Sequence, residues 1–492
     1  MTKDVHILLA FLTALFASLF VMPKLSYIAN RIGLIDQPNA RKIHSTPRPL
    51  VGGLGIVISA TFSCLVFMPL EGMRGFFSGL ALLLLVGFFD DYMEVGHRKK
   101  FLAQILATAL LIYLSKVQLS NFGDLLGLGD LIVPPPIFLV WCVTVFCVVG
   151  VTNAVNMIDG LDGLAGGLAF LAFLSFAIIS SMSSNTTLML LNLAFCGAIL
   201  GFLKYNWSPS VLFMGDSGSL CLGFALSFMA IALTQYEGAD VPPVSMLLVL
   251  AVPISDTLGV MTKRLVKHSS PFKPDKTHLH HILMAIGLSQ NVTVVLILLL
   301  SACFCSLGIA AIFYNIPEPA LFIIFLCYFL VNYKLDLILG GLVSLAGPFG
   351  SKQDSAPKTT DHSILQGTGR WKVFRNAHPY TADLSIRVRC KIPGPEFSGR
   401  ILNVSENGFL AQINDLVALE QTFLIDIMLT NGTVQSNRTF VAEQLWMSES
   451  KGGYYHGFRF VDMSPQLLSE WKSYLELIRQ NGNNELFSLY AE

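Results

Sequence analysis

Three carboxylates stand at the end of an apolar run in the segment FFDDYMEVG. Asp90 and Glu94 are four residues apart, and Asp91 and Glu94 are three apart, so a helix would place each pair on one face. Adjacent carboxylates repel each other, and they become tolerable where a cation or a positively charged group lies between them. The segment therefore predicts a cation site, and a solvated helix end is the alternative.

A second polar stripe lies in NAVNMIDGLDGLAGG, where Asn153, Asn156, Asp159 and Asp162 follow one another at three-residue spacing. Ionisable groups at membrane depth are costly, and by default they mark a functional site. The glycines that follow let a backbone or a ligand approach closely. We therefore predict that this stripe binds a ligand, and packing alone is the alternative.

Asp216 opens a further apolar run in the segment FMGDSGS, between Gly215 and Gly218. A carboxylate in this position is either a helix N-cap or an oxygen ligand for a hard cation. The free N–H groups at the start of a helix also favour an anion. Asp216 is therefore a candidate metal ligand.

Three histidines, His278, His280 and His281, follow a basic stretch that includes Arg264 and Lys276. A histidine cluster can bind zinc. No Cys joins this cluster, and the basic neighbours would repel a cation, so phosphate binding by His, Lys and Arg is the better interpretation. A basic loop with incidental histidines is the alternative.

An earlier basic segment, DQPNARKIHSTPRPLVGGLG, holds Arg41, Lys42, His44 and Arg48 before a Gly-rich stretch. It is either a second contact for a phosphate or lipid headgroup, or a basic loop that orients the chain in the membrane. Taken together, groups suited to Mg²⁺ (or Mn²⁺) and groups suited to phosphates are the inventory for phosphoryl transfer. One substrate would arrive from the cytosol and the other from the bilayer.

The elements that carry these residues are apolar. Of the 492 residues, 53% are hydrophobic and 13% charged, whereas a soluble domain carries roughly 25% charge. Residues 1–340 hold 35 charged side chains, and residues 341–492 hold 29. We predict a membrane domain over residues 1–344, a linker over 345–368 and a soluble domain over 369–492. The net charge of +0 gives no basic field for nucleic acid.

A bilayer crossing needs roughly 20 apolar residues, and eleven runs qualify as transmembrane helices. They are 5–23, 51–70, 76–90, 101–116, 133–152, 164–182, 187–204, 211–233, 244–262, 292–312 and 319–340. The loops on one side hold fourteen Lys and Arg residues, and those on the other side, with the N-terminus, hold three. The basic side is therefore predicted to be cytoplasmic, and the C-terminal domain with it.

The five polar segments, in this order, resemble those of the polyprenyl-phosphate N-acetylhexosamine-1-phosphate transferases, and PNARKIHSTPRPLVGG and PFKPDKTHLHH are most similar to their WecA branch. The resemblance implies a multi-pass enzyme of the bacterial inner membrane, among inner-membrane lipids. It implies the reaction of a UDP-sugar with undecaprenyl phosphate, giving undecaprenyl-diphosphate-sugar and UMP. N-acetylglucosamine is the expected sugar, N-acetylgalactosamine and 6-deoxy sugars stay open, and homodimers are common in the family.

The resemblance also implies roles for single residues. Those expected near the reacting phosphates and the nucleotide-sugar are Asp90, Asp91, Asp159, Asp162, His278, His280 and His281. Those expected to bind Mg²⁺ are Asp216 and Asn156. Those expected to contact substrate are Lys42, His44, Asn153, Arg264, Lys276 and Phe213, an aromatic that packs on uracil.

Two alternatives to this enzyme remain. A transporter or flippase of lipid-linked sugars also combines many helices with intramembrane acids. Against it, the acids gather at one membrane face rather than at the midplane, and no inverted repeat is evident. The peptidoglycan branch of the same family, which transfers a larger phospho-sugar, is the second alternative.

The C-terminal part shows short alternating runs separated by Gly, Asn and Pro turns, which predicts a small antiparallel barrel followed by a helix with Ser464 as its N-cap. It resembles the PilZ domain, a cyclic-di-GMP-binding barrel. Asn403, Ser405 and Gly408 match the motif [D/N]-x-S-x-x-G. In the R-x-x-x-R motif Arg375 is present, but Asn376 and Tyr380 stand where the two arginines belong. A cyclic-di-GMP-responsive domain and an interaction or structural module are therefore both open.

Overall fold

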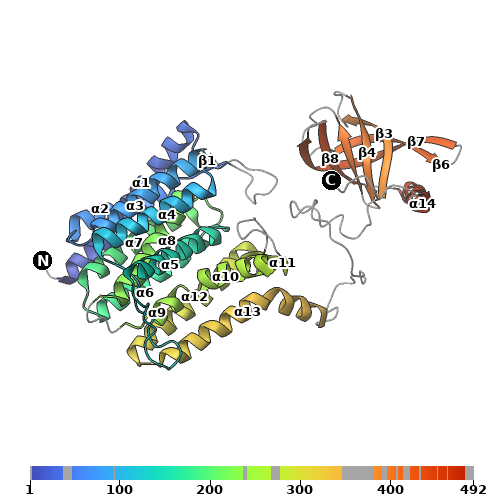
Figure 1. The fold of residues 1–492 in the computed structure, drawn as a ribbon. Coiled ribbons are helices and arrows are strands. Elements are labelled where there is room, and N and C mark those ends of the chain that lie inside the picture. Colours follow the sequence, from blue (N-terminus) through green and yellow to red (C-terminus); the bar gives the residue numbers. More distant parts are fainter. Residues whose placement is uncertain are drawn as a thin grey trace. The chain divides into compact units, whose positions relative to one another are not determined.

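The computed structural model describes residues 3–36, 47–93, 95–236, 241–266, 277–345, 380–390, 396–405, 408–413, 422–431, 434–450, 453–461 and 464–481. These residues form two units, a helical one and a β-barrel, and each is described by itself (Figure 1). The predicted linker lies outside the described residues except for Leu345, so its bounds stay a prediction.

The helical unit contains thirteen described helices and one short β-ladder. In chain order they are α1 (Lys3–Ile32), β1 (Ile35–Asp36), β2 (Arg48–Pro49), α2 (Gly52–Phe67), α3 (Arg74–Met93), α4 (His97–Ser115), α5 (Ile137–Ile158), α6 (Leu164–Met182), α7 (Thr186–Asn206), α8 (Asp216–Thr234), α9 (Pro243–Val249), α10 (Ala251–Val266), α11 (Leu279–Ala285), α12 (Gln290–Phe313) and α13 (Glu318–Leu345). Most of the long helices run roughly along one direction (Figure 1).

Eight described helices are long and apolar enough to cross a membrane, and the count is nine if α9 and α10 form one span with a 78° bend. The predicted count of eleven is therefore not confirmed. Helix α2 has 16 residues, which is short for a bilayer crossing. The first turn of α4 contains three basic residues, Arg98, Lys99 and Lys100, which lower the hydropathy of the helix.

Close helix packing brings α2, α3 and α8 together. A Cβ atom on Gly53 would lie 2.0 Å from the Gly218 nitrogen, and one on Gly87 would lie 2.4 Å from the Ser217 Cα. Only glycine fits at such approaches. Phe76 of α3 adds ring contacts to α8, with centroids 4.6 Å from Phe228. The Gly87 contact sets the first turn of α8 against the last two turns of α3, and the Phe76 contact joins the first turn of α3 to a later turn of α8.

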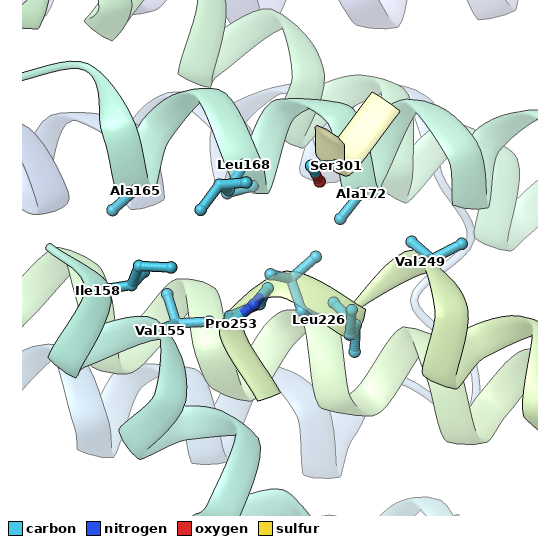
Figure 2. A pocket seen from close by; sticks show the side chains of 11 residues that line it. Val155, Ile158, Ala165, Leu168, Ala172, Leu226, Val249, Pro253 and Ser301 are labelled. Carbon is cyan, nitrogen blue, oxygen red and sulfur yellow. The ribbon is translucent and has the colours of Figure 1, made fainter. Parts of the chain in front are cut away.

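An internal cavity of about 10 Å³ lies in the apolar core between α5, α6, α8, the α9–α10 bend and α12 (Figure 2). Val155 and Ile158 of α5 and Leu168 of α6 line it, and Ser301 supplies its one hydroxyl group. A water molecule needs at least this volume and two or more polar partners. The cavity is therefore a packing gap and not a substrate site.

The barrel consists of six antiparallel strands, β3 (Tyr380–Cys390), β4 (Glu396–Ser405), β5 (Gly408–Ile413), β6 (Thr422–Asn431), β7 (Val434–Ser450) and β8 (Gly453–Phe460). Their order is β3-β4-β5-β8-β7-β6, and β3 pairs with β6 to close the barrel. Helix α14 (Pro465–Asn481) follows and packs Trp471 against Phe440 and Phe460. Ser464 accepts a hydrogen bond from the Leu467 N–H, as its predicted N-cap role requires. The predicted small antiparallel barrel is confirmed.

Candidate active site

The predicted polar residues gather at one end of the helical unit. Asp90 and Asp91 lie in the last turn of α3, and Lys100 lies in the first turn of α4. Asn156 lies in the last turn of α5, and Asp216 is the first residue of α8. Helix α8 packs on both α3 and α5. The fold therefore brings together residues that lie up to 126 positions apart in the sequence.

Lys100 lies between two of the carboxylates. Its Nζ atom is 2.8 Å from Asp90 Oδ2 and 2.5 Å from Asp216 Oδ2. The second oxygen of Asp90 is buried and has no hydrogen-bond partner. An ammonium group thus offsets part of the negative charge of a site that the sequence pattern assigns to a cation.

Asp91 has a different role from its neighbour, because its carboxylate caps α8. Its Oδ1 accepts a hydrogen bond from the Asp216 N–H at 2.7 Å, and its Oδ2 accepts one from the Ser217 N–H at 3.1 Å. Gly215 precedes the helix at φ +74°, and a Cβ there would lie 2.5 Å from Asp91 Oδ2. A carboxylate at a helix N-terminus is favourable. Asp91 therefore positions Asp216.

The two asparagines of the polar stripe point to different partners. The Asn156 amide nitrogen donates to Asp216 Oδ1 at 3.1 Å and to Ser219 Oγ at 2.9 Å. The Asn153 amide nitrogen donates to Gln104 Oε1 at 2.8 Å. Asn156 thus belongs to the carboxylate centre, and Asn153 links α5 to α4.

Arg48, from the earlier of the two basic segments, contacts both Asp162 and Phe213. Arg48 Nη1 donates to Asp162 Oδ2 at 3.1 Å and also to the Ser210 hydroxyl, and its guanidinium carbon lies 5.1 Å from the Phe213 ring centroid. Asp159 is exposed, in the turn after α5.

The histidine segment is tied down by a buried acid. Asp256 of α10 is 2% exposed; its Oδ2 lies 2.8 Å from His278 Nδ1, and its Oδ1 accepts from the Leu279 N–H at 2.7 Å. His280 is 2% exposed and lies against Gly160, where a Cβ would be 2.6 Å from Nε2. Burial, together with His281, lowers the pKa of His280 to about 3. His281 is half-buried, its ring centroid 4.2 Å from that of His280.

The donor set fits a hard divalent cation. Asp216, Asp90 and Asn156 offer carboxylate and amide oxygens, and Asp90 has a buried oxygen without a partner. Within the described residues, no three His, Cys, Asp or Glu side chains converge as a complete metal site. Mg²⁺ commonly binds through one or two carboxylates and completes its shell with water and substrate phosphate. The residues present match that mode.

Five residues named in the sequence analysis lie outside the described part of the chain: Lys42, His44, Glu94, Lys276 and Arg375. Arg264 lies in the last turn of α10 and is 5% exposed.

Three residues have contacts that the sequence patterns did not indicate. Asp256 could have been recognised, because it is an acid within an apolar run, which is a functional signal in membrane segments. Lys100 is the last of three consecutive basic residues, and nothing in the sequence separates it from its neighbours. Arg48 likewise stood out only as part of a basic loop.

In the barrel, the PilZ-like motif spans the β4–β5 connection. Asn403 and Ser405 lie in β4, and Ser405 pairs with Gly408 at the start of β5. A Cβ on Gly408 would lie 2.1 Å from the Phe458 carbonyl oxygen of β8. The glycine of the motif is therefore required by strand packing in this chain.

Two family models match the chain. The model of glycosyl transferase family 4 matches residues 73–234, and the PilZ domain model matches residues 372–477. The first range contains the described carboxylate centre, from Asp90 to Asp216. The second contains the barrel and most of α14.

Curated relatives match this chain over most of their own length. A Bacillus subtilis (strain 168) protein named "Probable undecaprenyl-phosphate N-acetylglucosaminyl 1-phosphate transferase" is 33% identical over 310 residues, covering 61% of this chain and 84% of the relative. The undecaprenyl-phosphate alpha-N-acetylglucosaminyl 1-phosphate transferase of Escherichia coli (strain K12) is 30% identical, covering 62% and 84%. The Yersinia pestis protein of the same name is 31% identical, covering 67% and 90%.

Among solved structures, the chain is similar to the PilZ domain with c-di-GMP of YcgR from Escherichia coli. The identity is 14%, the match covers 23% of this chain and 98% of that chain, and the TM-score is 0.19.

Proposed function

The chain belongs to glycosyl transferase family 4 and carries a C-terminal PilZ domain, and from this premise we propose that it transfers N-acetylhexosamine 1-phosphate from a UDP-sugar to undecaprenyl phosphate. The proposed sugar is N-acetylglucosamine, the sugar named in the curated relatives. The product would be undecaprenyl-diphosphate-sugar, the first lipid-linked intermediate of a surface polysaccharide.

The observation that carries this proposal is the convergence of Asp90, Asn156 and Asp216 around Lys100. Four helices supply one group each, and all four groups meet at one end of the unit. Phosphoryl transfer needs positioned charge more than it needs covalent chemistry, and this centre provides both signs of charge.

In the proposed reaction an oxygen of the lipid phosphate attacks the β-phosphorus of the UDP-sugar. The new P–O bond forms as the bond from the β-phosphorus to the bridging oxygen breaks, and UMP leaves with that oxygen. A phosphate monoester has its second pKa near ~6, so the nucleophile is mostly a dianion at neutral pH. Asp90 is placed to accept the residual proton, because its second oxygen has no other partner.

Asp216 and Asn156 would hold a divalent cation, with Mg²⁺ proposed and Mn²⁺ as its substitute. When bound, the cation would neutralise charge on the diphosphate. Asp91 keeps Asp216 in place through the α8 cap. The half-buried His281 and the basic loops are proposed to contact the phosphates, because histidine and basic side chains suit them.

We propose that the end carrying the site faces the cytoplasm of the bacterial inner membrane. The support is the excess of Lys and Arg, fourteen against three, in the loops at that end. A membrane-impermeant thiol or amine reagent on intact cells tests this, because residues such as Lys99 should stay unlabelled until the membrane is opened.

The reaction is tested with purified full-length protein, undecaprenyl phosphate and a panel of UDP-sugars, with UMP release as the readout. UMP from UDP-N-acetylglucosamine supports the proposal. UMP only from UDP-N-acetylmuramoyl-pentapeptide would assign the peptidoglycan branch, and no UMP from any donor would favour transport of lipid-linked sugars. Asp216→Asn is the inactive control.

For the C-terminal domain we propose a regulatory or interaction module. The PilZ model match favours cyclic-di-GMP as its ligand, whereas Asn376 and Tyr380 at the arginine positions favour contact with a protein. Calorimetry of the full-length protein with cyclic-di-GMP decides between them. Binding heat that saturates at micromolar cyclic-di-GMP would identify this nucleotide as the ligand of the domain. No binding heat at tens of micromolar would identify the domain as an interaction module.

A further inference from the structure

Both oxygens of Asp216 already have a donor. Oδ1 accepts from the Asn156 amide at 3.1 Å, and Oδ2 accepts from the Lys100 ammonium at 2.5 Å. Lys100 also holds Asp90 at 2.8 Å, and its side chain is only 17% exposed. Each oxygen keeps a second lone pair, but a cation bound there beside Lys100 would lie within a few ångströms of the ammonium group.

Of the two donors, Lys100 is the one that has to leave. An amide group has an oxygen as well as a nitrogen, so Asn156 can turn its oxygen to a cation and stay in place. An ammonium group has three donors and no acceptor, so it cannot ligate a metal ion. Its positive charge would also repel a divalent cation at a distance of a few ångströms.

We propose that Lys100 is a built-in counter-ion of Asp216, which a divalent cation displaces, and that the displaced ammonium group then binds a substrate phosphate. The identity of that phosphate rests on the proposed function, whereas the competition between Lys100 and the cation does not.

Charge balance supports both halves of this exchange. Without a cation, Asp90 and Asp216 would repel each other across the site, and Lys100 offsets that repulsion. Once a cation takes over Asp216, the ammonium group has lost one of its two partners. A diphosphate bound beside the cation offers new anionic oxygens, and a flexible four-carbon stem lets lysine reach them as a point charge.

The competition is tested by Mn²⁺ binding to purified full-length protein without substrates, followed by the EPR signal of free Mn²⁺. Lys100→Met removes the charge and keeps the length of the side chain. Lys99→Met is the matched control, because Lys99 is the exposed neighbour in the same helical turn. We expect Lys100→Met to bind Mn²⁺ about tenfold more tightly or better, and Lys99→Met to change the Kd less than about twofold.

An unchanged or weaker Mn²⁺ affinity in Lys100→Met would overturn the proposal, and so would an equal shift in Lys99→Met. Asp216→Asn, added to the Lys100→Met variant, must abolish the tight binding of Mn²⁺. If it does not, the cation binds elsewhere and the proposal fails.

The phosphate half is tested by turnover at saturating Mn²⁺. Lys100→Met should then lose at least about tenfold in kcat despite its tighter metal binding, and Lys100→Arg should recover part of it. Full turnover in Lys100→Met would exclude a phosphate contact. Absence of UMP release in the wild type, with tighter Mn²⁺ binding in Lys100→Met, would refute the transferase assignment and leave the counter-ion in place.

Discussion

At the scale of single residues, Asp256 holds the histidine segment. It offers one carboxylate oxygen to His278 and the other to the Leu279 N–H, and it is almost fully buried. We predict that Asp256→Ala lowers the free energy of unfolding by roughly 2–4 kcal/mol, because two buried polar groups lose their partner. Thermal unfolding in detergent measures this. Asp256→Asn, which keeps an acceptor for the Leu279 N–H, should lose less than half as much, and equal losses in both variants would contradict the account.

His280 gives a prediction for the effect of pH on stability. Burial lowers its folded pKa from 6.5 to about 3, so below pH 6.5 the unfolded chain binds a proton that the folded chain does not. Stability should therefore fall as the pH drops from 6.5 towards 3, by up to about 1.4 kcal/mol per pH unit from this group. The acid slope of the thermal midpoint should be shallower in His280→Leu than in wild type. His97→Leu, which removes an exposed histidine, is the control. An equal slope in wild type and His280→Leu would show that His280 does not titrate this way.

Asp90 and Asp91 are neighbours in the sequence but contact different helices. Asp91 caps α8, whereas Asp90 contacts Lys100. We predict that Asp91→Ala lowers both stability, by about 1–2 kcal/mol, and turnover, because the cap of α8 is lost. Asp90→Ala should abolish turnover and change stability by less than about 1 kcal/mol. The loss of the contact with Lys100 is offset by the removal of a buried oxygen without a partner and of the repulsion with Asp216. Thermal unfolding and UMP release on the same preparations test this, and matching stability losses would be evidence against separate roles.

At the scale of helices, the contact of α2 with α8 depends on Gly53. A Cβ there would lie 2.0 Å from a backbone nitrogen of α8, so Gly53→Ala should force the helices apart and cost about 3 kcal/mol. Gly150, in α5, has no atom within 4 Å of its Cβ position, and Gly150→Ala should be neutral or slightly stabilising. The thermal midpoints of the two variants measure the difference, and similar values would contradict the close approach.

The sequence predicted the presence of the long helices, but not all of their ends and only part of the contacts between them. The run 164–182 coincides with α6, because hydropathy alone defines it. The run 133–152 begins four residues before α5 and ends six residues before its end, and the run 244–262 is broken by the 78° bend between α9 and α10. The segment starting at Asp216 was predicted as either a cap or a ligand, and the choice depends on the distant Asp91, which periodicity cannot reveal. Lys100 could not be told from Lys99, because the difference arises from which helix face meets α3 and α8.

At the scale of the whole molecule, the proposed reaction belongs to the helical unit, and the proposed regulatory or interaction role belongs to the barrel. Every described residue of the carboxylate centre lies before the barrel, between Asp90 and Asp216. We therefore predict that a chain ending at residue 355 keeps UMP release within about threefold of the full chain without nucleotide. Assays of both chains in the same lipid test this. Complete loss of activity in a truncated chain that still unfolds cooperatively would show that the barrel contributes to catalysis.

The most direct test follows the two phosphates of the donor separately. UDP-N-acetylglucosamine is labelled either at the α- or at the β-phosphorus and incubated with undecaprenyl phosphate, a divalent cation and wild-type protein or Asp216→Asn. The account predicts that the β-label moves to the lipid and the α-label stays in UMP, and that neither moves in the variant. Release of the β-label as UDP, with only the sugar passing to the lipid, would contradict it.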